Sequence, residues 1–292
     1  MQSYSDRDFG GDRDGSRDGS RDGSRDLNCD ADGDANRRNS LNVVGLTFDQ
    51  RLICFNENNP GEARNIGFVS GFVGDVSLIG IDFRVQDNKL YGVGNAGGIY
   101  TLDTRNASAI KVGQVSIPLQ GTSFGVDFNP AANALRIISD TGQNLRVPFA
   151  TGAPGATVMD GTLTYPPATT PATGVAGAGY TNNDLDTNTA TTLYDVDSAM
   201  DQIAIQSPAN AGSLAATGKL TVDTTAQVGF DVYSVIRNGV TVAVQALASL
   251  TLTTSGGNGL YSVNLPTGKA TSRGNFSSQN QVIGIAIPLN QL

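Results

Sequence analysis

Several residue types are absent or rare in this chain of 292 residues. It has no His and no Trp, only 2 Cys and 4 Lys, and its acidic residues are 25 Asp against 2 Glu. Without His, the chain cannot build a Ser/His/Asp triad, a Cys/His dyad or a His-ligated zinc or haem site. Two cysteines are also too few for a thiolate metal cluster. The composition therefore excludes several enzyme classes and favours a protein that is not an enzyme.

The charged residues divide the chain at about residue 40. Residues 1–40 carry 10 Asp and 7 Arg, whereas residues 41–292 carry 12 basic and 17 acidic residues, so the net charges are −3 and −5. Neither part is basic enough to bind nucleic acid through its phosphates, and we expect no nucleic-acid partner. No run reaches the roughly 18 apolar residues of a membrane span. We therefore expect an N-terminal arm, residues 1–40, and a folded domain, residues 41–292.

The arm contains a four-residue repeat of Arg, Asp, Gly and Ser that begins at Arg13. A segment with almost no apolar side chains is typical of a solvated, disordered chain. In an extended conformation, however, the even period would place the arginines on one face and the aspartates on the other. These arginines are Arg17, Arg21 and Arg25. Such a ribbon could lie along an acidic neighbour, and the simplest candidate for this partner is another copy of the protein.

Oxygen-bearing side chains alternate in the segment that follows the repeat. They are Asp30, Asp32, Asp34 and Asn36. Alternating carboxylates around a Gly turn suit calcium, which takes about 6–8 oxygen ligands. The stretch resembles the first half of the calcium loops of dockerins and thrombospondin type 3 repeats, but Leu41 stands where the full loop has a bidentate acid. The segment therefore predicts either a calcium site or a solvated acidic turn.

The two cysteines lie in different parts of the chain. Cys29 belongs to the arm and Cys54 to the beginning of the folded domain. A disulfide between them would attach the arm to the domain in an oxidising compartment. Two unpaired thiols are the alternative, because two cysteines in a chain of this length form no recognisable framework.

From Leu41 onward, short runs of β-branched and aromatic residues alternate with Gly, Asn, Asp, Pro and Thr, without a helical period. The clearest unit has four expected strands at 78–83, 89–94, 98–103 and 109–115. A second unit repeats it 45 residues later, at 124–128, 134–139, 144–149 and 156–159. Two looser units follow, at 175–180, 192–197, 202–205 and 213–216, and at 228–233, 240–245, 259–264 and 269–272.

The two ends of the domain supply one more unit between them. Residues 42–48, 51–55 and 64–69 match strands two to four, and residues 281–288 match strand one. The sequence therefore predicts an all-β fold, a β-propeller of five four-stranded blades closed by the C-terminal strand. A sixth blade would require a hidden strand in the Thr/Pro-rich stretch 165–173. A pair of β-sandwiches is the rival architecture, although sandwiches do not predict a repeat of this length.

Several phrases of the domain occur together in the bacterial DUF4394 family, which this chain resembles. They are Leu-Ile-Gly-Ile-Asp-Phe-Arg at 78–84, Lys-Leu-Tyr-Gly-Val-Gly at 89–94, Tyr-Thr-Asn-Asn at 180–183, Thr-Thr-Leu-Tyr-Asp-Val-Asp at 191–197 and Gln-Ser-Pro-Ala-Asn-Ala-Gly-Ser-Leu at 206–214. The resemblance covers roughly residues 42–290 and leaves the arm outside. It implies a propeller-like, usually exported domain of unknown function, with no catalytic residue to carry over. We accordingly expect an extracellular protein.

A Gly-x-Asp pattern recurs in the first strand of three units. Its aspartates are Asp82, Asp127 and Asp231, whereas the third and fifth units have Gly179 and Ala286 at the Asp position. Because side chains alternate along a strand, each Gly and its Asp share one face. Three carboxylates that face a central channel could hold a cation such as calcium or raise one another's pKa. In the alternative, structural interpretation, each Asp accepts hydrogen bonds from backbone N–H groups of its own or the next blade.

These patterns lead to two functional expectations. The first is a non-catalytic extracellular structural or adhesive propeller, whose N-terminal arm joins copies of the protein, as in a filament. The alternative is a glycan-binding propeller or a calcium-dependent hydrolytic one, because carboxylates alone can support such chemistry.

Overall fold

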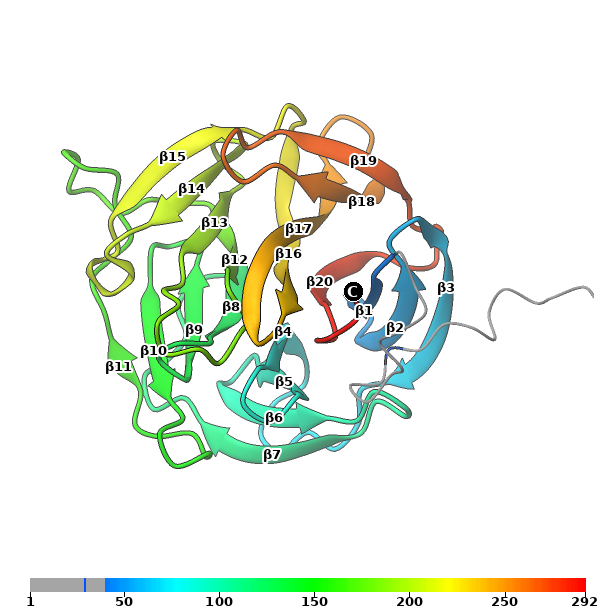
Figure 1. Cartoon of the computed structure of the whole chain (residues 1–292). Helices are drawn as coiled ribbons and strands as arrows, with labels where there is room; N and C mark the ends of the chain where they lie inside the picture. The colour runs from blue at the N-terminus through cyan, green and yellow to red at the C-terminus, as the bar shows by residue number, and fades with distance from the viewer. Residues whose placement is uncertain (1–28, 30–39) are drawn as a thin grey trace, which may run out of the picture.

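The structure is a computed structural model that describes Cys29 and residues 40–292. Five antiparallel sheets of four strands surround a common centre (Figure 1). Each sheet has one of its two edge strands at this centre, and we call that strand the inner strand. The predicted five-bladed β-propeller is therefore confirmed. The only helical element among the described residues is a 3-10 turn, η2 (Ala209–Ala211). No helix in this part of the chain has the length and hydrophobicity to cross a membrane.

We number the blades in chain order. Blade I consists of β4 (Leu78–Arg84), β5 (Lys89–Gly94), β6 (Gly98–Leu102) and β7 (Ala109–Gln114). Blade II consists of β8 (Phe124–Asn129), β9 (Ala134–Ser139), β10 (Asn144–Pro148) and β11 (Val158–Met159). Blade III consists of β12 (Val175–Tyr180), β13 (Leu193–Asp197), β14 (Gln202–Gln206) and β15 (Leu214–Lys219). Blade IV consists of β16 (Thr224–Arg237), β17 (Val240–Leu252), β18 (Asn258–Val263) and β19 (Ala270–Asn275).

Blade V contains both ends of the domain. Its strands, from the centre outward, are β20 (Val282–Ala286), β1 (Asn42–Thr47), β2 (Arg51–Asn56) and β3 (Asn59–Phe68). The C-terminal strand pairs antiparallel with β1, with Val44 opposite Ala286 and Leu46 opposite Gly284. This pairing closes the ring as predicted, and it leaves no blade with an incomplete sheet whose inner edge could aggregate.

Apolar side chains fill the spaces between neighbouring blades. At the boundary of blades I and II, the rings of Tyr91, Phe128 and Phe149 meet edge to face, with centroids 5.1–5.6 Å apart. The guanidinium carbon of Arg84 lies 5.2 Å from the centre of the Phe149 ring. The inner strands are buried on both faces, and every residue of β12 is buried. This explains why their sequences are mostly apolar and contain Gly.

One expectation about the blades needs correction, and one alternative can be discarded. The second strand of the fourth unit was predicted at 240–245, but β17 continues to Leu252, and its pairing with β18 runs from Ala246 to Thr251. Residues 240–245 instead extend the β16–β17 hairpin beyond the blade, because an Asn238-Gly239 turn allows the two strands to pair up to their ends. The stretch 165–173 forms no strand, so the propeller has five blades and not six.

A disulfide attaches the segment before the propeller to blade V. Cys29 and Cys54 are bonded, with their Cα atoms 5.9 Å apart. Both are fully buried in the apolar cluster between blades V and I, which also contains Val44 and Leu46. The covalent link therefore fixes one point of the N-terminal segment inside the closed ring.

We expect loss of this disulfide to lower the free energy of unfolding by about 3 kcal/mol, because the link closes a loop of 25 residues in the unfolded chain. Urea unfolding of the wild type with and without a thiol reductant measures the effect. The Cys29→Ser/Cys54→Ser double variant is the control, since its unfolding should not respond to reductant. A wild-type midpoint that is the same in both conditions would contradict this expectation.

Candidate functional site

The three aspartates of the Gly-x-Asp repeat meet at the centre of the propeller. Asp82 lies on β4, Asp127 on β8 and Asp231 on β16, and the residues are only 7%, 4% and 4% exposed. One carboxylate oxygen of each lies within 4.8 Å of those of the other two. We call these three residues the carboxylate ring. Closure of the propeller therefore brings together side chains that are up to 149 positions apart in the sequence.

Each carboxylate of the ring accepts a hydrogen bond from the inner strand of the next blade. The donors are the backbone N–H groups of Phe128 to Asp82 Oδ2 (2.7 Å), Tyr180 to Asp127 Oδ1 (3.0 Å) and Ile287 to Asp231 Oδ2 (2.6 Å). In every case, the donor follows the residue of the next blade that is equivalent to the aspartate. The inner strands belong to separate sheets, so these bonds link neighbouring blades at the axis.

Blades III and V have Gly179 and Ala286 in place of an aspartate and offer no carboxylate to the blade that follows. In the blades that follow them, blades IV and I, the equivalent backbone N–H group instead donates to the aspartate of its own strand. Phe83 N donates to Asp82 Oδ1 (2.7 Å), and Val232 N donates to Asp231 Oδ1 (2.5 Å). The three carboxylates therefore accept the equivalent backbone N–H group of all five blades.

The glycines of the repeat allow the inner strands to approach this closely. A Cβ atom on Gly125 would lie 2.6 Å from the backbone nitrogen of Ala178, and one on Gly229 would lie 2.7 Å from the Cα of Gly284. Both contacts are to backbone atoms of the next blade, which cannot move aside cheaply. Gly-x-Asp is thus one structural unit, since the Gly admits the neighbouring strand and the Asp accepts its N–H group.

Burial raises the pKa of each carboxylate in the ring, and repulsion by the other carboxylates adds to the shift for Asp82 and Asp127. Burial raises the pKa of Asp82 well above its usual range, and the charge of Asp231 raises it further. The pKa of Asp127 is also well above its usual range, first through burial and then through the charges of Asp82 and Asp231. Burial raises the pKa of Asp231 to about 7, although two backbone N–H groups oppose this shift. Carboxylates of the ring are therefore protonated at mildly acidic pH, where an exposed aspartate is ionised.

The same three carboxylates are the described side chains best placed to hold a metal ion. Both oxygens of Asp82 and of Asp231, and one oxygen of Asp127, already accept backbone N–H groups. Calcium would need about 6–8 oxygen ligands, and the ring offers carboxylates from three residues. The hydrogen bonds alone account for the position of each aspartate.

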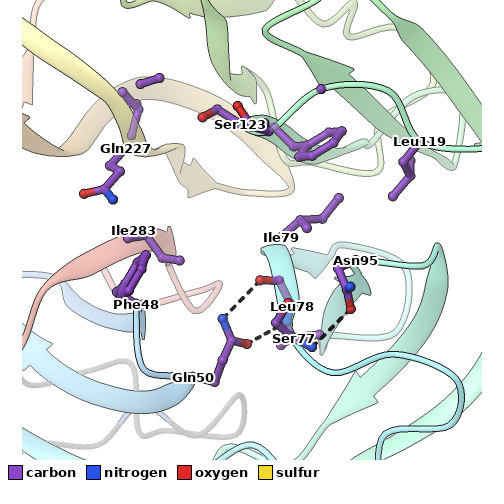
Figure 2. A pocket seen from close by; sticks show the side chains of 15 residues that line it. Phe48, Gln50, Ser77, Leu78, Ile79, Asn95, Leu119, Ser123, Gln227 and Ile283 are labelled. Carbon is purple, nitrogen blue, oxygen red and sulfur yellow. Dashed lines mark hydrogen bonds between the residues drawn. The ribbon is translucent and has the colours of Figure 1, made fainter.

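A pocket of about 670 Å³ opens at the mouth of the channel where the inner strands begin. Figure 2 shows side chains of different blades that face this space, with Phe48 and Ile283 from blade V, Ile79 from blade I and Gln227 from blade IV. Deeper in the channel, the inner strands leave a space of only about 20 Å³, enough for roughly one water molecule. The channel is therefore much narrower between the inner strands than at its mouth.

A buried arginine, which the sequence patterns did not single out, joins blades II and III. Arg136 is 1% exposed and donates to Tyr180 Oη (3.2 Å) and Asn144 Oδ1 (2.7 Å), and it forms an ion pair with Asp160 (2.6 Å). Nearby Asp195 is fully buried, neither of its oxygens has a hydrogen-bond partner, and burial raises its pKa well above the usual range. A lone Arg within the apolar run Leu135–Ile138 is the sequence signal that could have indicated this cluster.

The remaining predicted site residues lie outside the described part of the chain. They are the arm residues Arg17, Arg21 and Arg25 and the calcium-loop residues Asp30, Asp32, Asp34 and Asn36. The assembly role of the arginines and the calcium site remain predictions.

A family model described as "Domain of unknown function (DUF4394)" matches residues 51–286. This range covers more than half of the chain and includes all of blades I to IV and every strand of blade V except β1. No curated protein sequence matches the chain. The family resemblance expected from the sequence phrases is thereby confirmed.

Many solved structures are similar to the chain at low sequence identity. An auxiliary nutrient binding protein from Bacteroides ovatus is 12% identical with a TM-score of 0.40, and the match covers 60% of this chain and 46% of that one. A protein from Lactobacillus plantarum is 11% identical with a TM-score of 0.42, covering 85% and 99%. Myxococcus xanthus glutaminyl cyclase is 10% identical with a TM-score of 0.39, covering 72% and 90%. Likenesses this distant carry no argument about function.

Replacing single ring aspartates by Asn should distinguish the contribution of their hydrogen bonds to stability from the contribution of their charge. In Asp127→Asn, the remaining oxygen can still accept from Tyr180 N, and one of three repelling carboxylates is removed. We expect this variant to be more stable than the wild type at pH 8 by about 1 kcal/mol. Asp82→Asn removes the same charge but also one of two acceptor oxygens, so it should be about 1–3 kcal/mol less stable than Asp127→Asn.

Urea unfolding of the two variants tests this expectation. An Asp127→Asn variant that is destabilised as strongly as Asp82→Asn, and that loses a metal ion found in the wild type by elemental analysis, would assign the ring to cation binding instead.

The raised pKa values also predict how stability depends on pH. An unfolded aspartate titrates near pH 4, and the ring titrates higher, with Asp231 at about 7. The stabilisation that belongs to the protonated ring is complete below pH 4 and is lost as the pH rises through the folded-state values. The free energy of unfolding should therefore fall between pH 5 and pH 8 by more than about 1 kcal/mol. Chemical unfolding across this range measures the slope, which should be shallower in Asp127→Asn.

Proposed function

The chain belongs to the DUF4394 family, a domain of unknown function, and from this premise we propose that it is a non-catalytic structural or adhesive propeller that acts outside the cell. We further propose that its N-terminal arm joins copies of the protein. The proposal rests first on the carboxylate ring. These buried acids have raised pKa values, and their oxygens accept backbone N–H groups that link neighbouring blades.

The pocket at the channel mouth supports a non-catalytic role in a second way. Its lining contains no Asp, Glu, Lys, Arg or Cys, so no lining side chain can serve as a general acid or base near neutral pH. Of the lining hydroxyl groups, that of Thr122 donates to Asp140 Oδ2 (2.6 Å), but the lining itself supplies no acid or base that would complete a nucleophilic site.

The disulfide supports a location outside the cytoplasm. Such bonds form and persist in oxidising compartments, and this one is fully buried in the closed ring. It also attaches the arm covalently to blade V at Cys29. A pull on the arm would therefore be transmitted directly to the closed ring.

The spacing of the arginines, and not the net charge of the arm, supports contact with another copy. Both the arm (net charge −3) and the folded domain, residues 41–292 (net charge −5), are acidic, but the arm carries three regularly spaced arginines, Arg17, Arg21 and Arg25. An extended arm with an arginine face would be attracted to the acidic domain of a neighbour. An added arm segment can also associate through its backbone hydrogen bonds, which need no particular side chains.

A calcium-dependent hydrolytic propeller is the second candidate. One observation favours it, the approach of three carboxylate oxygens to within 4.8 Å of one another in the ring. The opposite effects expected of Asp127→Asn on stability, with or without a bound cation, separate this candidate from the structural one.

Light scattering of the full-length protein tests the assembly role. We expect the wild type to associate as its concentration increases, and less so at high salt. The triple variant Arg17→Ser/Arg21→Ser/Arg25→Ser should remain monomeric, because the attractive face of the arm is lost.

The matched control replaces the same number of charged arm residues on the opposite face, as Asp18→Ser/Asp22→Ser/Asp26→Ser. This control should still associate. A monomeric wild type, or equal association of both triple variants, would refute assembly through the arm.

A further inference from the structure

The pocket at the channel mouth has a rigid rim. The side chain of Gln50, in the β1–β2 turn of blade V, accepts a hydrogen bond from Leu78 N (2.6 Å) and donates one to Leu78 O (3.3 Å) on blade I (Figure 2). On blade I, Asn95 Oδ1 accepts from the backbone nitrogens of Val76 (2.9 Å) and Ser77 (3.2 Å). These bonds fix the rim before any ligand arrives, which reduces the entropy lost on binding.

The volume of the pocket, about 670 Å³, is in the range of about 300–1,000 Å³ that small-molecule sites occupy. Its lining has no charged side chain. A phosphate, carboxylate or ammonium group would have to give up part of its hydration without gaining a lining side chain of opposite charge, which opposes its binding. The pocket therefore favours an uncharged ligand.

Two polar groups of the lining retain unused donors. Asn95 uses its oxygen for the rim, and Gln227 Oε1 accepts from Gln281 Nε2 (2.6 Å). The amide nitrogens of Asn95 and Gln227 have no acceptor among the described residues. Figure 2 shows these two side chains on opposite sides of the space. They can donate to a ligand that carries several neutral oxygen atoms.

Phe48 adds an aromatic surface at the same rim. It is 61% exposed, and its backbone nitrogen is held by the carbonyl oxygen of Gln281 (2.8 Å). Because its ring is largely outside the core, packing of the fold gives little reason for a phenyl group in this turn. A ring in this position offers a flat apolar face on the same side of the space as Gln227, with Asn95 across from it (Figure 2).

We propose that this pocket binds a neutral saccharide, with the C–H face of a sugar ring against Phe48 and its hydroxyl oxygens accepting from Asn95 and Gln227. A sugar combines an apolar face with many uncharged oxygen atoms, which matches the two kinds of surface in the pocket. The site goes beyond the proposed assembly role and does not involve the arm. It would give the closed propeller a ligand for adhesion.

Binding of the full-length wild type to immobilised oligosaccharides tests the proposal. The panel contains neutral gluco-, galacto- and manno-oligosaccharides beside sulfated and uronic-acid-containing ones, and titration calorimetry with the soluble form of a bound sugar gives its Kd. We expect binding to neutral members only. Absence of binding to every neutral member, or equal binding of charged ones, would overturn the proposal.

Two variants then locate the site. Phe48→Ala should raise the Kd at least about 10-fold through loss of the aromatic face. Gln227→Glu keeps the oxygen that accepts from Gln281 but removes the donor, and it should also weaken binding. Phe68→Ala is the matched control, because Phe68 is 64% exposed but does not line the pocket.

Phe68→Ala should bind as the wild type does, and unchanged binding by Phe48→Ala would refute the site. The triple arginine variant of the arm should also keep full affinity for the sugar. Failure of the assembly proposal would therefore leave this result intact, and failure of sugar binding would leave arm-mediated assembly intact.

Discussion

The hydrogen bonds from backbone N–H groups to the carboxylate ring solve a problem that every propeller has at its axis. Each blade is a separate sheet that ends at its inner strand, so the N–H groups on that edge have no neighbouring strand to receive them. Left unsatisfied in the interior, each would cost about 1–3 kcal/mol. Asp82, Asp127 and Asp231 accept one such group from all five inner strands and also link adjacent blades. The same three side chains therefore provide hydrogen-bond acceptors for buried N–H groups and hold neighbouring blades together.

This arrangement has an electrostatic cost. Three carboxylates within 4.8 Å of one another repel when ionised, and burial removes the water that would screen them. Their pKa values are raised for this reason. The use of three aspartates instead of five is consistent with this limit, because Asp82 and Asp231 each serve two N–H groups and two blades need no carboxylate of their own. Fewer charges at the axis achieve the same number of hydrogen bonds.

The axis and the mouth of the channel therefore differ in chemistry. At the axis, charged groups are buried and engaged by the backbone, whereas the pocket above them is uncharged and keeps amide donors and an exposed phenyl ring. A propeller can change the loops at its mouth without altering the strands that close the ring. Such a division fits a stable scaffold that presents a binding surface at one end, and the disulfide at Cys29 strengthens the scaffold on the side of its N-terminal segment.

The number of blades and the closure of the ring could be predicted from the sequence. The four-strand unit recurs, first after 45 residues, and the two ends of the domain supply three strands and one strand of a further unit, which leaves few other architectures. The Gly-x-Asp pattern likewise placed Asp82, Asp127 and Asp231 on the inner strands. The β16–β17 hairpin was misjudged, since alternating Val240, Val242 and Val244 look the same in a blade and in an extension beyond it. Arg136 and Asp195 were missed because their environment comes from two blades at once.

The sequence by itself thus determined the repeat, the strand order and the face of each strand on which a side chain lies, because these depend on local periodicity. Only the tertiary structure revealed the hydrogen bonds on which the structural interpretation of the aspartates depends, since their acceptor oxygens meet donors 46–56 residues away in the chain. It also decided where the pocket lies. Phe48, Asn95 and Gln227 come from three blades and share no sequence pattern, and closure of the ring alone brings them to one mouth.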